Sequence, residues 1–222
     1  MNRVIIVSVD GNIGSGKSTL LEYLKKIWVD KKLCDCKVIF LKEPLDEWEK
    51  IKDEEGITML EKFYENQEKY SFPFQMMAYI SRLKLLKETL ENNEDCIIIT
   101  ERSLYTDKMV FAKMLYDNKK IEHINYLVYI NWFDTFIKDF PLDKIIYIKA
   151  NPEICLSRIN KRSRQGEGNI PLDYLKQCHE YHENMIDCLD INKLILDGNI
   201  DIYDSQDKLE EWKSKIENFI SK

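Results

Sequence analysis

The sequence predicts an α/β protein in which helices cover both faces of a five-stranded parallel sheet, giving three layers, α/β/α. Five short apolar runs lack the polar alternation of a half-exposed sheet, which is typical of parallel strands buried on both faces. Longer segments with helical spacing separate these runs, as in a doubly wound sheet. The predicted strands are Val4–Val9, Val38–Leu41, Cys96–Thr100, Ile145–Ile148 and Leu194–Leu196.

The helical segments between these strands differ in length. Apolar residues recur at helical spacing from Leu20 to Trp28, directly after the first strand. Met59–Glu91 and Tyr105–Phe140 are long and largely helical, each with polar interruptions. Because no repeat, low-complexity linker or shift in composition divides the chain, we expect a single domain over residues 1–222.

The composition bounds the class of protein. A chain of 222 residues with 44% hydrophobic and 32% charged residues can bury a core without disulfides or metals. The net charge of −6 disfavours nucleic acid and anionic membrane surfaces as partners. No apolar run approaches the length of a membrane span, and the first strand starts too early to leave room for a signal peptide. The expected location is therefore cytoplasmic.

Cysteine and histidine form no recognisable metal or disulfide pattern. The six cysteines have neither a CxxC motif nor zinc-site spacing, so we expect free and mostly buried thiols. His179 and His182 lack a third ligand with metal spacing, so we expect them to be packing or surface residues.

A glycine-rich segment joins the first predicted strand to the first predicted helix. Strand, glycine loop and helix in this order form the context that a phosphate-binding loop requires. The glycines let backbone N–H groups turn inward, and the start of the helix directs its positive dipole end at the same anion. Lys17 would reach the outer phosphates and Ser18 would offer its hydroxyl to Mg²⁺, so the segment predicts a nucleotide site. Its residues are Gly11, Asn12, Ile13, Gly14, Ser15, Gly16, Lys17, Ser18 and Thr19.

Carboxylates follow two of the predicted strands. Glu43 comes after the second strand, and Glu101, with Arg102, comes after the third. In a doubly wound sheet these positions lie beside the phosphate loop. Because a carboxylate there repels a nucleotide unless it handles a proton or a metal ion, we predict such roles for Glu43 and Glu101.

A basic cluster begins about ten residues after the fourth predicted strand, and Gly166 and Gly168 follow it. Arginines on a glycine-flanked segment suit a lid that closes over transferring phosphates and neutralises their charge. The alternative is a basic helix face on an acidic protein, and the neighbouring phosphate loop favours the lid. The predicted lid spans about 158–170, and its cluster consists of Arg158, Lys161, Arg162 and Arg164.

Further motifs follow in order along almost the whole chain. They are the phosphate loop, Glu43-Pro44 with Trp48, Tyr64, Ser71-Phe72-Pro73-Phe74-Gln75, Ser81-Arg82, Glu101-Arg102-Ser103 with Asp107, and Cys155-Leu156-Ser157-Arg158 through Arg162, Arg164 and Glu167 to Ile170-Pro171-Leu172. This set resembles the deoxynucleoside kinase family. The resemblance implies a P-loop kinase fold with a helical lid, which transfers the γ-phosphate of ATP or another NTP, with Mg²⁺, to the 5′-hydroxyl of a deoxynucleoside. It also implies a homodimer, with Ser81–Leu90 and Tyr126–Phe140 as candidate interface segments.

The resemblance implies individual roles. Glu43 matches the general base for the 5′-hydroxyl, Arg102 the residue that holds that hydroxyl and the phosphates in line, and Glu101 the carboxylate that organises Mg²⁺. Tyr64 and Glu167 match positions that hold the deoxyribose 3′-hydroxyl. The residues expected to neutralise phosphate charge are Lys17, Arg158, Arg162 and Arg164, and candidate contacts of the donor base are Asp201 and Ile202.

The residues expected to hold the acceptor base are Trp48, Phe74, Gln75, Ala78, Arg82, Asp107 and Phe111. Gln75, Ala78 and Arg82 share one helix face. Phe74 and Phe111 would stack on the base, and Trp48 would close the pocket. The Gln75 amide can pair with the Watson–Crick edge of any base by flipping, so it does not select one.

We expect Arg82 and Asp107 to select the base. A buried carboxylate can accept from an exocyclic amine, and a paired arginine compensates its charge. In the family that it resembles, this pair accompanies a preference for deoxycytidine or purines, so thymidine is expected to be poor. The alternatives are a structural ion pair and a thymidine-preferring enzyme, because the nearby Met76 and Met77 can reshape a pocket.

Two other classes of protein share the phosphate loop. A thymidylate or other nucleoside monophosphate kinase would need an extra basic group dedicated to the acceptor phosphate. The segment from Tyr64 to Arg82 instead predicts a pocket for an uncharged nucleoside. A GTPase-like switch would need a guanine-reading Asn-Lys-x-Asp motif, and Asn192-Lys193 lacks the aspartate.

Overall fold

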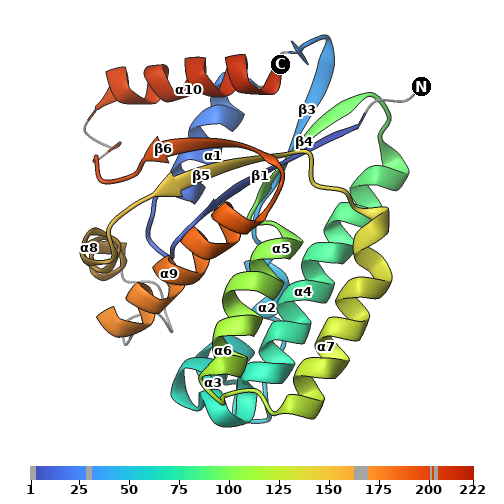
Figure 1. The fold of residues 1–222 in the computed structure, drawn as a ribbon, viewed down its shortest axis with the longest axis vertical. Helices are drawn as coiled ribbons and strands as arrows, with labels where there is room; N and C mark the ends of the chain where they lie inside the picture. Colours follow the sequence, from blue (N-terminus) through green and yellow to red (C-terminus); the bar gives the residue numbers. More distant parts are fainter. Residues whose placement is uncertain (1–3, 29–31, 163–169, 201, 203–204) are drawn as a thin grey trace.

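A six-stranded sheet in the order β2-β3-β4-β1-β5-β6 forms the middle layer of the molecule (Figure 1). The structure is a computed structural model, and it describes residues 4–28, 32–162, 170–200, 202 and 205–222. Neighbouring strands from β3 to β6 are parallel and match the five predicted runs, so the predicted α/β class is confirmed. These strands are β1 (Ile5–Gly11), β3 (Cys36–Leu41), β4 (Cys96–Glu101), β5 (Lys144–Lys149) and β6 (Asn192–Asp197).

The predicted count of five strands is wrong by one. The additional strand, β2 (Lys32–Leu33), pairs antiparallel with β3 at the edge of the sheet. Cys34 and Asp35 join the two strands with φ angles of 52° and 62°, and a two-residue type I′ hairpin turn requires positive φ at both positions. A two-residue strand has no detectable period, and Cys-Asp is not a typical pair for this turn, so the sequence carried no signal for β2.

Helices cover both faces of the sheet (Figure 1): α1 and α10 lie on one face, and α4, α5, α7 and α9 lie on the other. Within the described residues, no helix is both long enough and apolar enough to cross a membrane. The helices are α1 (Lys17–Ile27), α2 (Leu45–Trp48), α3 (Met59–Glu65), α4 (Gln67–Asn92), α5 (Leu104–Thr106), the π-helical η1 (Asp107–Ala112), α6 (Lys113–Asp117), α7 (His123–Phe136), the 3₁₀ turn η2 (Ile137–Asp139), α8 (Pro152–Arg162), α9 (Leu172–Cys188) and α10 (Gln206–Ile220).

The side chains of β1 alternate between two cores. Val7 and Val9 pack with Leu24 of α1 in the core on the α1 and α10 side. Ile6 packs with Tyr79 of α4 on the opposite side. Since side chains two residues apart on a strand share a face, Ser8 and Asp10 lie on the same side as Ile6 and place polar groups there.

The parallel register brings the strand ends to one edge of the sheet. Val9 of β1 lies opposite Glu101 of β4, and Leu41 of β3 lies opposite Thr100. The residues that follow β1, β3 and β4 therefore emerge side by side, as expected for a doubly wound sheet.

Side-chain caps begin α3 and α4, two helices that follow β3 along the chain. Thr58 and Glu61 form a reciprocal capping box at the start of α3, and the side chain of Asn66 accepts from the Lys69 N–H at the start of α4. These caps satisfy N–H groups that have no partner within the helix. The cap at Asn66 places the boundary between α3 and α4, where the sequence predicts only a polar interruption of one long helical segment.

We expect Thr58→Ala to lower the free energy of unfolding by about 1 kcal/mol, because it removes the cap of α3. Thr89→Ala is the matched control: Thr89 lies within α4 and its hydroxyl donates to the Leu85 carbonyl, so alanine there is neutral or slightly stabilising. Urea unfolding of both variants and the parent chain measures the difference. Equal losses for the two variants would contradict the role of the cap.

Candidate active site

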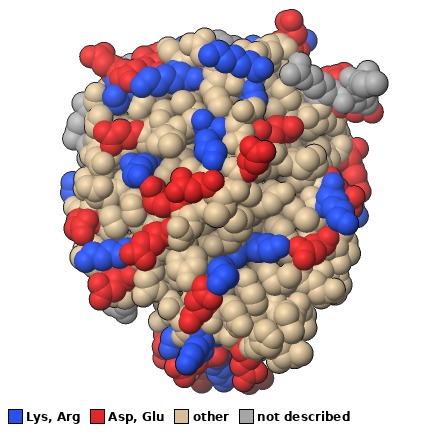
Figure 2. Space-filling view, viewed as in Figure 1, with Lys and Arg blue, Asp and Glu red and all other residues tan. Residues whose placement is uncertain are grey.

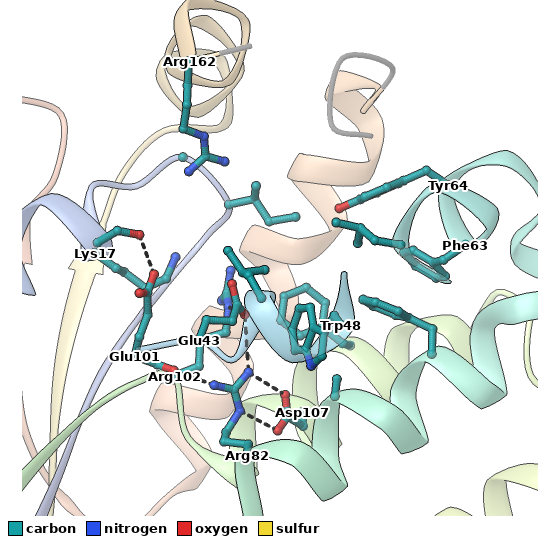
Figure 3. Close-up of a pocket in the computed structure, with 18 of the residues that line it drawn as sticks. Lys17, Glu43, Trp48, Phe63, Tyr64, Arg82, Glu101, Arg102, Asp107 and Arg162 are labelled. Atoms are coloured by element: carbon teal, nitrogen blue, oxygen red, sulfur yellow. Dashed lines mark hydrogen bonds and ion pairs between the residues drawn. The ribbon is translucent and has the colours of Figure 1, made fainter. Parts of the chain in front are cut away.

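One cavity of about 500 Å³ opens at the carboxyl edge of the sheet, between the phosphate loop, α2, α3, α4 and α8 (Figure 3). It brings most of the sequence-predicted residues into a single site. The predicted residues that line it are Ile13, Gly14, Gly16, Lys17, Ser18, Thr19, Glu43, Trp48, Tyr64, Phe74, Gln75, Ala78, Arg82, Glu101, Arg102, Asp107, Phe111, Arg158 and Arg162.

Several predicted residues do not line the cavity. Gly11, Asn12 and Ser15 belong to the phosphate loop and lie behind its lining face. Ile202 is buried beside the loop, with its Cδ1 atom 3.6 Å from where a Cβ on Gly16 would stand. Three further predictions, Arg164, Glu167 and Asp201, lie outside the described residues.

The phosphate loop needs glycine for close packing. A Cβ on Gly14 would stand 2.6 Å from the Cys155 carbonyl oxygen, and one on Gly11 would stand 2.6 Å from the Ile148 carbonyl oxygen. Gly14 also has a φ of +77°, a backbone conformation that residues with a side chain rarely adopt. The loop ends at Lys17, where α1 begins, so the N-terminus of this helix faces the cavity.

The Lys17 side chain, at the end of this loop, is buried. Its Nζ donates to the Asn12 carbonyl at 2.7 Å. Burial first, and then the neighbouring charge of Arg102, lower the pKa of Lys17 to about 7. An anion beside Lys17 would favour its charged form, which suits a phosphate site.

Ser18 and Glu101 supply oxygen atoms for a metal ion. The Ser18 hydroxyl donates to Glu101 Oε1 at 2.6 Å across the cavity (Figure 3). A hydroxyl and a carboxylate are the hard oxygen ligands that Mg²⁺ prefers, so the donor set fits this ion. Because the described residues hold no cluster of three or more His, Cys, Asp or Glu, further ligands would come from phosphate oxygens and water.

Arg102 adopts a rare backbone conformation next to Glu101. Five non-glycine residues in the described ranges have a positive φ, and Arg102, at 65°, is the buried one among them. Such a conformation persists only where the surroundings hold it. The Arg102 N–H donates to the Val9 carbonyl at 3.0 Å, and its guanidinium donates to the Gly11 carbonyl at 2.8 Å. The guanidinium also lies 4.8 Å from the centre of the Phe111 ring.

Four charged side chains form a network on the side of the cavity next to α4 (Figure 3). Arg82 Nε donates to Asp107 Oδ2 at 2.9 Å, so the predicted pairing of these two residues is confirmed. Glu43 Oε1 lies 3.4 Å from Arg82 and 3.4 Å from Arg102. Burial raises the pKa of Asp107, and the charge of Arg82 opposes that rise.

The predicted base-binding residues of α4 lie on one face, toward the cavity. Gln75, Ala78 and Arg82 are buried and line it together. Among the described residues, the buried Oε1 atom of Gln75 has no hydrogen-bond partner. A buried unsatisfied carbonyl is costly, and an N–H donor on a ligand would satisfy it.

An aromatic cluster closes the same side, and it includes one residue that the sequence analysis missed. Phe63 of α3 stacks on Phe74, with ring centres 4.4 Å apart, and Trp48 meets Phe74 edge-on at 5.6 Å. Phe63 precedes Tyr64 on a short helix, and no periodicity in the sequence singled it out. Tyr64, from the same helix, directs its hydroxyl toward the cavity (Figure 3). Trp48 is held in place because its indole N–H donates to Ser81 Oγ at 2.8 Å.

The basic helix α8 borders the phosphate side. Arg162 points from its end toward the cavity (Figure 3). Arg158 donates instead to backbone carbonyls, at 2.8 Å to Gly198, 2.9 Å to Ile200 and 3.3 Å to Ser15. Arg158 therefore joins the phosphate loop to the segment after β6, an arrangement that no pattern in the sequence indicated.

A single cavity thus combines a phosphate loop, a charged network and an aromatic pocket. Comparison with known proteins shows the family of the chain that forms it. The family model for deoxynucleoside kinases matches residues 7–221. This chain belongs to the deoxynucleoside kinase family. The family resemblance seen in the motifs is therefore confirmed.

Relatives within this family align over most of the chain. "Deoxycytidine kinase 1" of Xenopus laevis is 34% identical over 99% of this chain and 91% of its own length. "Deoxycytidine kinase" of Homo sapiens is 33% identical over 99% of this chain and 92% of its own length. "Deoxyguanosine kinase, mitochondrial" of Xenopus laevis is 31% identical over 81% of this chain and 72% of its own length.

Proposed function

We propose that this protein is a deoxynucleoside kinase that transfers the γ-phosphate of ATP or another NTP to the 5′-hydroxyl of a deoxynucleoside in nucleotide salvage. One observation carries this proposal: the cavity joins a phosphate loop to an aromatic pocket, and Glu43 stands where the two meet, 3.4 Å from both Arg82 and Arg102. Membership of the deoxynucleoside kinase family supports the same reaction.

The residues at this junction can perform the transfer. Glu43 accepts the proton of the 5′-hydroxyl as that oxygen attacks the γ-phosphorus, and the bond from phosphorus to the leaving oxygen of the nucleoside diphosphate breaks. Arg102 holds the attacking oxygen and the phosphoryl group in line. Ser18 and Glu101 would hold Mg²⁺, which neutralises phosphate charge when bound. The cations that would stabilise the transferring group are Lys17, Arg162 and Arg164, whereas Arg158 holds the phosphate loop through its hydrogen bonds to backbone carbonyls.

An uncharged acceptor suits the aromatic side of the cavity. Arg82 is the cation that α4 contributes there, and it is already paired with Asp107 and Glu43. An acceptor phosphate would meet two carboxylates rather than an available cation, so a nucleoside is favoured over a nucleoside monophosphate. Tyr64 and Glu167 would then hold the 3′-hydroxyl.

We further propose that the acceptor is deoxycytidine or a purine deoxynucleoside. Asp107 can accept from an exocyclic amine, and Gln75 can pair with the Watson–Crick edge between Phe74 and Phe111. The relatives named as deoxycytidine and deoxyguanosine kinases support this preference. Asp201 and Ile202 remain candidates for contact with the donor base.

The direct test is the initial rate with ATP and Mg²⁺ on deoxycytidine, deoxyadenosine, deoxyguanosine, thymidine and thymidine monophosphate. Highest activity on one of the first three nucleosides is expected. Highest activity on thymidine would keep the enzyme class and overturn the base preference. Activity on the monophosphate alone would identify a nucleoside monophosphate kinase.

We expect Glu43→Gln to lower kcat by about 10²- to 10⁴-fold, because it removes the proton acceptor and keeps the shape. Nucleoside affinity, measured by equilibrium titration, is expected to remain close to that of the parent. Glu22→Gln is the matched control, since Glu22 also lines the cavity but is exposed and paired with Lys42. Near-normal turnover of Glu43→Gln would remove Glu43 from the mechanism.

Replacing the pair by Arg82→Met and Asp107→Ala together should raise kcat/KM for thymidine relative to deoxycytidine by about 10-fold or more. The variant loses the acceptor for an exocyclic amine and gains room for the thymine methyl group. The ratio of the two kcat/KM values is the measurement, because it is insensitive to a general loss of activity. An unchanged ratio would mean that the pair is structural.

We also propose that the protein is a homodimer that associates through α4 and α7. An uncharged area lies over these helices at the lower right of Figure 2, whereas charges of both signs are interspersed over the rest of that face. These two helices also expose several large apolar side chains, and an exposed apolar surface is typical of an interface. The apolar residues exposed there are Ile80, Ile124, Leu127, Val128 and Trp132.

Leu127→Glu is expected to convert the dimer to a monomer in sedimentation analysis, because it buries a charge in the interface. Ile195→Glu is the matched control: Ile195 is a similarly exposed apolar residue, but it lies on β6, away from α7. A parent chain that sediments as a monomer would refute the dimer. So would an equal effect of the two substitutions.

A further inference from the structure

Asp10 is a buried acid to which neither the sequence patterns nor the proposed mechanism assigns a role. It is fully buried and directly precedes Gly11, the first residue of the phosphate loop. Its side chain belongs to the face of β1 that meets α4 and α5. A buried carboxylate is costly unless hydrogen bonds satisfy it, so its partners are informative.

Those partners come from two parts of the chain. Ser8 Oγ, on the same strand, donates to Asp10 Oδ2 at 2.5 Å. The other oxygen, Oδ1, accepts from the backbone N–H of Ser103 at 3.3 Å and from the hydroxyl of Thr106. Asp10 therefore ties the strand that leads into the phosphate loop to the turn that begins α5.

The residues on either side of that turn belong to the two halves of the site. Arg102, just before it, has a positive φ of 65° and donates to the Gly11 carbonyl on the phosphate side. Asp107, just after it, pairs with Arg82 on the acceptor side. The side chains of Ser103 and Thr106 cap the turn reciprocally, so its shape depends on the two groups that Asp10 binds.

We propose that Asp10 is a positioning residue that holds the turn over residues 102–107 in register with the phosphate loop. Because it bonds to Ser103 and Thr106 together, it sets the placement of Arg102 relative to the phosphates and of Asp107 relative to the base. Small displacements of aligned groups slow a transfer reaction strongly, whereas they alter binding less. The catalytic part of this proposal rests on the proposed kinase function.

The first test compares two carboxylates that bond to the same strand. Asp10→Asn keeps the size of the side chain but loses the charge and one acceptor oxygen, and charge-assisted hydrogen bonds are the stronger ones. Asp143→Asn is the control, because Asp143 Oδ2 accepts from the Ile6 N–H at 2.8 Å, at the opposite end of β1. We expect kcat to fall about 10-fold or more in Asp10→Asn, with a smaller change in KM, and to stay near the parent value in Asp143→Asn.

A second comparison separates positioning from a loss of folding. Thr106→Val removes the hydroxyl that Asp10 accepts and should reproduce the loss of kcat, whereas Thr106→Ser should restore it. In an Arg102→Lys background, Asp10→Asn should lower kcat much less than in the parent, since its effect passes through Arg102. An equal fold-loss in both backgrounds, or a loss that follows only the folded fraction, would overturn the proposal.

Hydrogen exchange of the backbone amides provides a readout that needs no turnover. Asp10→Asn should speed exchange of the peptide that contains Ser103 and Thr106, and Asp143→Asn should leave that peptide unchanged. If the parent chain phosphorylates no deoxynucleoside, the proposed function fails while this measurement still tests the turn. Unchanged exchange in Asp10→Asn would refute the positioning role whatever the activity.

Discussion

Parallel pairing of β3, β4, β1 and β5 is the constraint on which the rest of the site depends. Because Val9 lies opposite Glu101, the phosphate loop after β1 and the Arg102 turn after β4 leave the sheet together. A shift of the strand register by one residue would turn every side chain of that strand to the opposite face of the sheet. It would then send Asp10 into the apolar core around α1 and break its bonds to the turn. The strand register, which burial of the apolar side chains fixes, therefore determines where the polar side chains of the site lie.

Charge balance links the two halves of the cavity. Glu43 follows β3, Arg82 belongs to α4, Arg102 follows β4, and Asp107 begins η1, yet all four meet through ion pairs. Removal of one member of a buried group leaves the others uncompensated, which is strongly unfavourable. The side chains that we propose for acceptor recognition thus also hold one another in a buried ion-pair network, so we expect substitutions there to affect stability as well as specificity.

Local patterns made much of this site predictable. The phosphate loop, the acids at strand ends and the face shared by Gln75, Ala78 and Arg82 depend on spacing within short segments. Phe63 escaped notice because its importance comes from stacking on Phe74, which belongs to another helix. The bonds from Arg158 to backbone carbonyls were equally hidden, since carbonyl positions depend on the path of distant loops.

The sequence by itself determined the α/β class, the nucleotide loop and the resemblance to deoxynucleoside kinases, because hydrophobic period and motif spacing are properties of neighbouring residues. Only the tertiary structure decided that the sheet gains β2, that Arg102 takes a positive φ, and that Asp10 binds Ser103 and Thr106. Asp10 and Thr106 are 96 positions apart, and their contact arises from strand register and helix packing, which no local pattern encodes.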